Sequence, residues 1–264
     1  MPSLLERVQQ LTGDDRLAAI REAAATTDPT TINDLVEILA SPDFGEPLRQ
    51  AAAESVAQCA MPCVAERLLP LRTSAEAFTR TMAALGLGGQ TSSAAIQSLV
   101  LGLADPVNTV RNWSERSLVG QISATRESGV PALLDLLTTP VPLTRSPAAR
   151  ILGLTRDPRG LHPLMEMAGK DPEWLPRMWA LKGLGDLGLT EATELVIDRM
   201  QNDPKNRVRA AAAEALGKLR PSHAETLLRA VLDTDDDDGV LKAAGEALRS
   251  LGFEVADIND DGWE

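Results

Sequence analysis

One stretch of this chain indicates its fold more clearly than any other. It reads Asp203-Pro204-Lys205-Asn206-Arg207-Val208-Arg209-Ala210-Ala211-Ala212-Ala213-Glu214-Ala215-Leu216-Gly217-Lys218-Leu219. A helix start is predicted at Asp203 and Pro204, because an Asp side chain can cap a helix and proline has no N–H to leave unsatisfied there. Apolar residues then recur at helical spacing, at Val208, Ala212, Ala215, Leu216 and Leu219. The alanines let a second helix approach closely, and Gly217 indicates a bend or stop.

The pattern returns along the chain at a nearly constant interval. Leu152-Gly153, Leu184-Gly185 and Leu216-Gly217 are 32 residues apart, and Val119-Gly120 and Leu85-Gly86 precede them by 33 and 34 residues. A second series places an acid six residues before a base, at Asp43 and Arg49, Asp105 and Arg111, Asp171 and Arg177, Asp203 and Arg209, and Asp236 and Lys242. Such self-similarity predicts an all-α fold, a right-handed superhelical α-solenoid of HEAT-like helix pairs.

The period predicts about eight pairs, each with an outer helix A and an inner helix B. They are expected at residues 3–11 and 14–25, 31–40 and 47–60, 63–71 and 75–87, 93–104 and 109–122, 130–138 and 143–154, 161–168 and 175–187, 191–201 and 207–219, and 223–232 and 240–251. Residues 1–252 are expected to form a single array, with an N-terminal cap at 1–27 and repeats at 28–252. Residues 253–264 are expected to be an acidic tail in which Phe253, Val255 and Trp263 can dock on the last helix.

The third pair departs from the pattern. Ser74 and Arg80 occupy the places of its acid and base, so the acid of the pair is missing. Gly88-Gly89 follows its second helix. We expect a kink or a loosened seam there, and a hinge is an open alternative.

Composition argues against several function classes. The formal net charge of −12 disfavours a nucleic-acid binder, since phosphate contacts need a basic surface. No apolar run is long enough for a membrane span, and no basic start precedes an apolar segment. We therefore expect a cytoplasmic protein with no nucleic acid partner and no membrane span.

The sequence offers little metal or catalytic chemistry. Cys59 occupies the repeat position of Leu187 and Leu219 and is expected in the core, although a disulfide to Cys63 one turn away is an alternative. A zinc site would need two more ligands, and the two histidines lie far away in sequence. No phosphate loop or nucleophile elbow occurs, so no metal is expected and no catalytic residue is identified.

The repeated Asp and Arg are interpreted as structural, because bonds along the stack can align neighbouring repeats. Departures from the pattern carry more functional information. With Val208 as position one of a B helix, position seven is Glu54 or Glu214 in the second and seventh repeats but a cation in the middle repeats, at Arg116, Arg150 and Lys182. Position four, normally Ala, is Trp113 or Trp179; Met178 shares the face, and Trp174 precedes the sixth B helix.

These residues form the candidate site. It consists of Trp113, Arg116, Arg150, Met178, Trp179 and Lys182. We expect a mid-array concave patch, with cations and indole faces that suit an acidic partner or a flat anionic ligand. The alternative is that the tryptophans fill gaps between repeats and that the cations are solvated.

The stretch at 203–219 resembles the HEAT-like repeat named after phycobilisome lyases, and the resemblance extends in degraded form over 28–252. Deoxyhypusine hydroxylase shares the repeat but holds two irons with His-Glu pairs, which His162-Pro163 and His223-Ala224 do not provide. HEAT-like DNA glycosylases carry aromatics in a basic groove, which the acidic composition disfavours. The remaining branch comprises bilin lyases and relatives in phycobilisome assembly and degradation.

That branch implies acidic phycobiliproteins and a linear tetrapyrrole with propionates as partners, which suits the candidate site. The aromatic-rich segments associated with the first subunit of the heterodimeric lyases are absent. We therefore expect a noncatalytic protein-binding scaffold, an adaptor or chaperone-like factor for phycobiliprotein subunits that needs no cofactor. One alternative is a bilin lyase or lyase subunit with a phycobilin as ligand or substrate and a second HEAT-like subunit. Another is a generic scaffold unrelated to pigment.

Overall fold

The structure is a computed structural model that describes residues 2–59 and 61–255. Over these residues the chain forms seventeen α-helices and four short 3-10 helices, with no strand. This confirms the predicted all-α fold of stacked helix pairs, an α-solenoid. The chain divides into two compact units, Met1–Ala132 and Leu133–Glu264. The single array over 1–252 stays a prediction, and Trp263 with most of the expected acidic tail lies outside the described residues.

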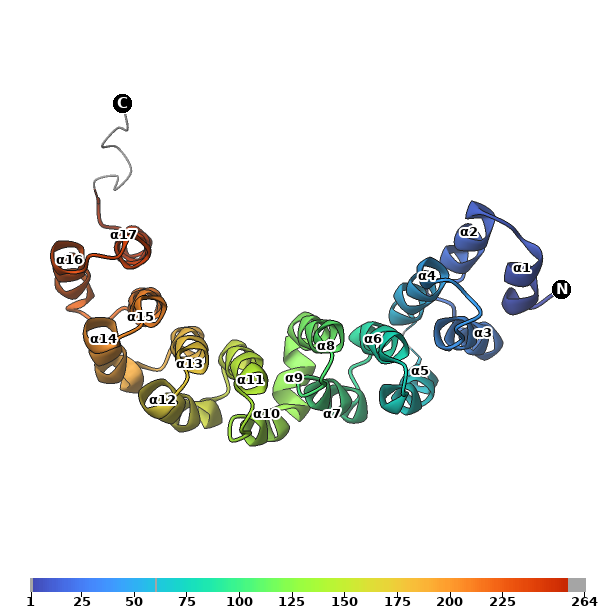
Figure 1. The fold of residues 1–264 in the computed structure, drawn as a ribbon, viewed down its shortest axis with the longest axis horizontal. Helices are drawn as coiled ribbons and strands as arrows, with labels where there is room; N and C mark the ends of the chain where they lie inside the picture. Colours follow the sequence, from blue (N-terminus) through green and yellow to red (C-terminus); the bar gives the residue numbers. More distant parts are fainter. Residues whose placement is uncertain (1, 60, 256–264) are drawn as a thin grey trace, which may run out of the picture. The chain divides into compact units, whose positions relative to one another are not determined.

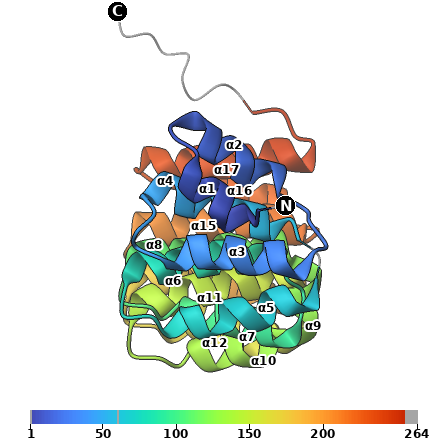
Figure 2. The ribbon, with the colours of Figure 1, turned by 90° about the vertical axis from the view of Figure 1, so that its right-hand side faces the viewer.

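The first unit contains two rows of helices. The A row consists of α1 (Leu4–Gln10), α3 (Pro29–Ala40), α5 (Pro62–Leu68) and α7 (Ser93–Gly102). The B row consists of α2 (Asp14–Glu22), α4 (Glu46–Ala57), α6 (Ala77–Gly86) and α8 (Asn108–Gly120). Short 3-10 helices follow α5 and α6, at Leu69–Thr73 and Leu87–Gly89. Figure 1 views these helices nearly end-on, and Figure 2 shows α3 and α5 from the side, running across the view.

The second unit repeats this plan with longer B helices. Its A row consists of α10 (Val130–Leu136, within which the division falls), α12 (Leu161–Lys170), α14 (Thr193–Asn202) and α16 (Ala224–Thr234). Its B row consists of α11 (Pro142–Thr155), α13 (Trp174–Leu187), α15 (Asn206–Leu219) and α17 (Asp238–Leu251). The other two 3-10 helices, Pro158–Gly160 and Thr190–Ala192, precede α12 and α14.

The core of the second unit follows the 32-residue period. The B helices contribute a fully buried leucine at each step, at Leu152, Leu184, Leu216 and Leu248. The A helices face them with Leu164, Val196 and Leu228, which are also fully buried. Burial of each such side chain stabilises the fold by about 1.5–3 kcal/mol. The 32-residue period of the sequence is therefore also the period at which buried side chains recur in the core.

One helix was not predicted. The segment α9 (Ile122–Ser128) lies between α8 and α10, where the sequence analysis expects a loop. The Thr125 hydroxyl is buried and donates a hydrogen bond to the Leu118 carbonyl oxygen at 2.9 Å. Because α9 depends on this hydrogen bond and not on an apolar period, hydrophobic spacing in the sequence does not predict it.

Two details of the defining stretch differ from prediction. Asp203 does not cap α15, because the helix begins at Asn206 and its N-cap residue is Lys205, which makes no side-chain capping bond. Gly217 does not stop the helix either, since α15 continues to Leu219. A Cβ atom on Gly217 would lie 2.8 Å from the Cβ of Ala247. Because glycine has no Cβ atom, α15 and α17 can pack closely at this position.

The seam expected at Gly88-Gly89 is also wrong. A Cβ atom on Gly89 would lie 1.7 Å from the carbonyl oxygen of Ala57, and one on Gly88 would lie 2.8 Å from the Ser117 hydroxyl. The Gln90 side chain donates a hydrogen bond to the Cys59 carbonyl oxygen at 2.9 Å. These glycines serve close packing inside the first unit, and the chain divides elsewhere, within α10.

The repeated arginines and acids form rungs between neighbouring repeats, as predicted. Each rung joins an arginine at the start of one B helix to an acid in the next repeat, at Arg80 and Asp105, Arg145 and Asp171, Arg177 and Asp203, and Arg209 and Asp235. In all four, Nε lies 2.7–2.9 Å from one carboxylate oxygen and Nη2 lies 2.8–3.1 Å from the other. Such bidentate pairs fix both distance and orientation. Arg49 also makes a bidentate pair, with Glu76, but through Nη1 at 2.7 Å and Nη2 at 2.8 Å.

The last rung corrects the predicted register of the eighth repeat. Its acid is Asp235 and not Asp236, so Leu241 rather than Lys242 stands where the other repeats carry arginine. The hydrogen bonds from Arg209 outweigh burial and lower the pKa of Asp235. The run of four aspartates made the register ambiguous in the sequence.

Arg111 is an exception among the rung arginines. Its guanidinium donates to the carbonyl oxygens of Asp105 and Pro106 and to Asn108. Thr139 stands in the fifth repeat where the next acid is expected, and threonine cannot accept a bidentate pair.

Candidate functional site

In the second unit, three of the predicted site residues meet around one indole ring. Trp179 lies on α13, with the guanidinium carbon of Arg150 from α11 at 5.6 Å and Nζ of Lys182 at 5.9 Å from the ring centroid. All three side chains are half-buried. The spacing of position four and position seven explains the meeting, because residues three apart on a helix lie on the same face. We call Arg150, Met178, Trp179 and Lys182 the indole cluster.

The charge of this cluster is partly balanced. Lys182 Nζ lies 2.8 Å from a carboxylate oxygen of Glu214 on α15, and the two side chains are 30% and 37% exposed. Cations over an indole face are attracted by its quadrupole, by about 0.5–1 kcal/mol at exposed sites. The cluster therefore places two cations near a half-buried indole, and Glu214 is paired with one of them, Lys182.

The other two predicted residues form a separate pair in the first unit. The guanidinium carbon of Arg116 lies 4.9 Å from the ring centroid of Trp113, and both residues belong to α8. Trp113 is half-buried and Arg116 is exposed. The predicted patch of six residues is thus seen as two groups, one in each compact unit, and its role in binding stays a prediction.

The helices that carry the indole cluster, α11 and α13, belong to the B row of the second unit. In Figure 1, α11, α13, α15 and α17 lie on the inside of the arc of this unit, and the A helices lie outside. The B helices also pack against one another far more extensively than the A helices do. The candidate site residues therefore lie on the row of helices that pack more closely against one another.

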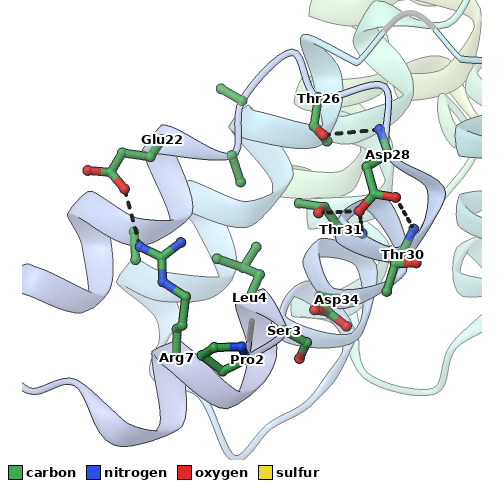
Figure 3. Close-up of a pocket in the computed structure, with 13 residues that line it drawn as sticks. Pro2, Ser3, Leu4, Arg7, Glu22, Thr26, Asp28, Thr30, Thr31 and Asp34 are labelled. Atoms are coloured by element: carbon green, nitrogen blue, oxygen red, sulfur yellow. Dashed lines mark hydrogen bonds and ion pairs between the residues drawn. The ribbon is translucent and has the colours of Figure 1, made fainter.

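The first unit contains a cavity of about 690 Å³ near its N-terminal helices, lined by residues of α1, α2 and α3 (Figure 3). Its polar groups are engaged in structural bonds. The Asp28 carboxylate accepts hydrogen bonds from the Thr31 hydroxyl at 2.6 Å and from the Thr31 and Thr30 backbone, which caps α3 and lowers the pKa of Asp28. Asp34 accepts from the Leu5 backbone N–H at 3.1 Å. The lining explains how the first repeat is held together and supplies no catalytic group.

A second cavity, of about 460 Å³, lies between α10 and α12 on the A row of the second unit. Leu134, Leu137 and Met167 make much of its wall apolar, and His162 and Lys170 lie at its rim. His162 is exposed.

The two cysteines differ in their burial. Both are free thiols, Cys59 is fully buried, and no group of three His, Cys, Asp or Glu residues able to hold a metal occurs within 2–59 and 61–255. Burial raises the pKa of the Cys59 thiol. The predicted core position of Cys59 is confirmed, and the alternative disulfide is not formed.

The sequence analysis noted Trp174 but did not identify its surroundings. Trp174 begins α13, and Lys205 Nζ and the Arg207 guanidinium carbon each lie 5.5 Å from its ring centroid. Lys205 is the N-cap residue of α15, and Arg207 lies in the first turn of that helix. Lys205 and Arg207 follow Trp174 by 31 and 33 residues, which is about one repeat. This spacing was the only sequence pattern that could have predicted the contact.

Comparisons with known proteins agree with this geometry. A family model of HEAT repeats matches residues 120–185 and 170–249. A chain from the complex of CpcE and CpcF of phycocyanin lyase from Nostoc sp. PCC7120 is 27% identical, with a TM-score of 0.53 over 59% of this chain and 99% of that chain. Residues 120–249 therefore carry HEAT repeats, and the chain is similar to a chain of a phycocyanin lyase complex.

Other solved structures share only the fold with this HEAT-like repeat protein. Yeast importin-β (Kap95p) is 12% identical, with a TM-score of 0.62 over 94% of this chain and 40% of that chain. A comparison with curated protein sequences gives no match. Among the described helices, none combines the length and the apolar character needed to cross a membrane. The HEAT repeats make the chain a repeat scaffold.

Proposed function

We propose that this HEAT-like repeat protein is a noncatalytic protein-binding scaffold, an adaptor or chaperone-like factor for phycobiliprotein subunits. The observation that carries the proposal is Trp179 with the cations of Arg150 and Lys182 at 5.6 and 5.9 Å from its ring centroid, in repeats similar to those of a chain from a phycocyanin lyase complex. An indole with two cations beside it fits an acidic surface that also offers an apolar side chain.

The Lys182–Glu214 pair supports exchange with a partner. Both side chains are about one-third exposed, and ion pairs of this kind contribute roughly 0–1 kcal/mol. A carboxylate of the partner can therefore replace Glu214 at small cost. The expected result is an association that depends on charge and weakens with salt.

The second candidate function is that of a bilin lyase or lyase subunit. It is favoured by the 27% identity across 99% of one chain from the CpcE–CpcF complex. In this role the array holds a phycobilin, with cations of the indole cluster at its propionates. A cysteine thiolate of the client then adds to one carbon of a C=C double bond of the pigment, and the other carbon of that bond takes up a proton from solvent. A second HEAT-like subunit would then complete the complex. A scaffold unrelated to pigment is the third candidate.

One experiment separates these functions. The purified protein is mixed with phycobilin, with and without apo-phycobiliprotein subunits, and the visible spectrum and zinc-enhanced fluorescence on a denaturing gel are recorded. A complex without covalent transfer supports the adaptor. Covalent pigment that appears only when this protein is present makes it a lyase. Absence of binding to both overturns the link to pigment.

The Arg150→Glu variant tests whether the indole cluster is the surface involved. It should weaken binding of the subunits by about tenfold or more, which is the effect of about 1.4 kcal/mol, while Trp179→Phe keeps an aromatic face and most of the affinity. Lys170→Glu is the matched control, because Lys170 is 78% exposed on the opposite row. Equal weakening by both charge reversals would contradict the assignment.

A further inference from the structure

The turns that lead into the B helices form one edge of the second unit, and this edge changes character from repeat to repeat. Val141, Glu173, Lys205 and Asp237 are the N-cap residues of α11, α13, α15 and α17. They stand at the same position, 32 residues apart. Along this edge the N-cap residue is therefore apolar, then acidic, then cationic and then acidic again. We call Val141, Leu143, Trp174, Lys205 and Arg207 the turn edge.

The apolar end of the turn edge is unusually exposed. Val141 and Leu143 are 50% and 55% exposed, and only Leu101 joins them as a large exposed apolar side chain in the part of the chain that the structure describes. Two such side chains occur within three residues, and Trp174 stands one repeat further along the same edge. Exposed apolar surface of this kind marks an interaction site more often than isolated residues do.

The cationic end is not explained by helix stability. Lys205 is the N-cap residue of α15 and Arg207 belongs to its first turn, where the helix dipole disfavours positive charge. No acidic residue occurs in that first turn. Within 2–59 and 61–255 neither side chain has an ion pair, and both lie over the Trp174 ring. The two cations are thus held on an indole and remain available to a carboxylate.

Neighbouring acids limit the cationic region. Glu173 is exposed on the α13 side of Trp174, and the Asp235–Asp238 run begins in the next repeat, where Asp237 accepts a hydrogen bond from the Asn206 side chain. A ligand with several carboxylates is therefore confined to the short stretch around Lys205 and Arg207. The apolar part of the same ligand must lie toward Leu143.

We propose that the turn edge of the second unit docks an acidic amphipathic segment of a partner protein. Its carboxylates face Lys205 and Arg207, and its apolar side chains cover Trp174, Leu143 and Val141. Adjacent packed helices are about 8–10 Å apart, so the span from α11 to α15 is about 16–20 Å. A helical segment of about 11–13 residues covers that distance. An anionic membrane is disfavoured as the occupant, because the chain carries a net charge of −12.

The test uses two substitutions that do not weaken their own helices. Leu143 and Arg207 lie in the first turns of α11 and α15, where an acidic side chain interacts favourably with the helix dipole. Leu143→Glu and Arg207→Glu should therefore leave the melting temperature unchanged or slightly raised. Lys242→Glu on α17 is the matched charge reversal, since Lys242 is 73% exposed.

The probe is a fluorescein-labelled peptide of about 15 residues made of Leu, Glu and Ala in an amphipathic helical pattern, followed by fluorescence anisotropy. Leu143→Glu and Arg207→Glu should each weaken its binding by about tenfold, and Lys242→Glu by less than about twofold. A version with Lys in place of Glu should not bind.

Other outcomes overturn the proposal. These are an unaffected affinity in both edge variants, an equal loss with Lys242→Glu, or no binding of the peptide. Binding to phosphatidylglycerol vesicles with the same dependence on Arg207 would assign the edge to a membrane instead. Loss with Arg150→Glu but not with Arg207→Glu would locate the peptide on the indole cluster, so this inference and the proposed function fail separately.

Discussion

Arg177 on α13 donates two parallel hydrogen bonds to Asp203 of the next repeat, from Nε to Oδ2 at 2.9 Å and from Nη2 to Oδ1 at 3.0 Å. The carboxylate of Asp203 is fully buried. Its Oδ1 also accepts the Lys205 backbone N–H at 2.9 Å, so one side chain shapes the turn and joins two repeats. This double use explains why the acid recurs with the period of the repeat.

Removal of the Arg177 guanidinium should therefore be costly. In Arg177→Gln the buried Asp203 carboxylate loses its bidentate partner, and the free energy of unfolding should fall by about 3 kcal/mol. Urea denaturation measures the change. Arg111→Gln is the matched control, because Arg111 stands at the same repeat position without a carboxylate partner among the described residues. It should cost less than about 1 kcal/mol, and equal costs would show that the rung pairs do not stabilise the stack.

Acid should destabilise the first unit through Glu76. Hydrogen bonds from Arg49, and then from Thr79, lower the pKa of Glu76 from 4.5 to about 2. Because the pKa is depressed in the folded state, this carboxylate stabilises the fold above pH 4.5, and its contribution is lost as the pH falls from 4.5 to about 2. Glu76→Gln should have a lower melting temperature at neutral pH and a shallower decline over that range. Glu66→Gln, at an exposed carboxylate, should follow the wild-type curve; parallel curves for all three proteins would refute the linkage.

A single methyl group should separate α11 from α13. In Gly153→Ala the added Cβ would lie 2.3 Å from Cα and 2.5 Å from the carbonyl oxygen of Gly183, so backbone must move. We expect a loss of about 1–3 kcal/mol in the free energy of unfolding. Gly120→Ala is the control, because no heavy atom lies within 4 Å of its Cβ position at the end of α8. It should gain about 0.5–1 kcal/mol, and a gain at both sites would mean that α11 and α13 are not in close contact.

The two thiols should differ in reactivity. Cys59 is fully buried and its pKa is raised by burial, whereas Cys63 is half-buried on α5. Since the thiolate is the reactive species, a maleimide should label Cys63 in the folded protein and Cys59 only after denaturation. Mass spectrometry of the labelled peptides gives the order. Cys63→Ser should leave the native protein nearly unlabelled, and rapid labelling of that variant would contradict the buried position of Cys59.

The sequence predicted the helix pairs because their buried leucines recur with the same period as the helices themselves. It did not predict α9, which depends on a buried threonine bond to Leu118 rather than on an apolar period. The rung partner Asp235 was displaced by one residue in the prediction because four successive aspartates give no local distinction. Helical spacing did bring Trp179 and Lys182 together. The environment of Trp174 depends on a contact between repeats, which no spacing within one helix indicates.

The glycine contacts between B helices have a geometric consequence. Gly153 against Gly183, Gly185 against Ala215 and Gly217 against Ala247 shorten the spacing along the inner row of the second unit. On the outer row, larger side chains such as Leu164 and Val196 occupy the buried positions. A stack of wedges that are thin on one side and thick on the other must bend toward the thin side. The volumes of the side chains between neighbouring helices thus set the curvature of the second unit. A substitution that adds or removes one methyl group at these positions would change that curvature by a small step.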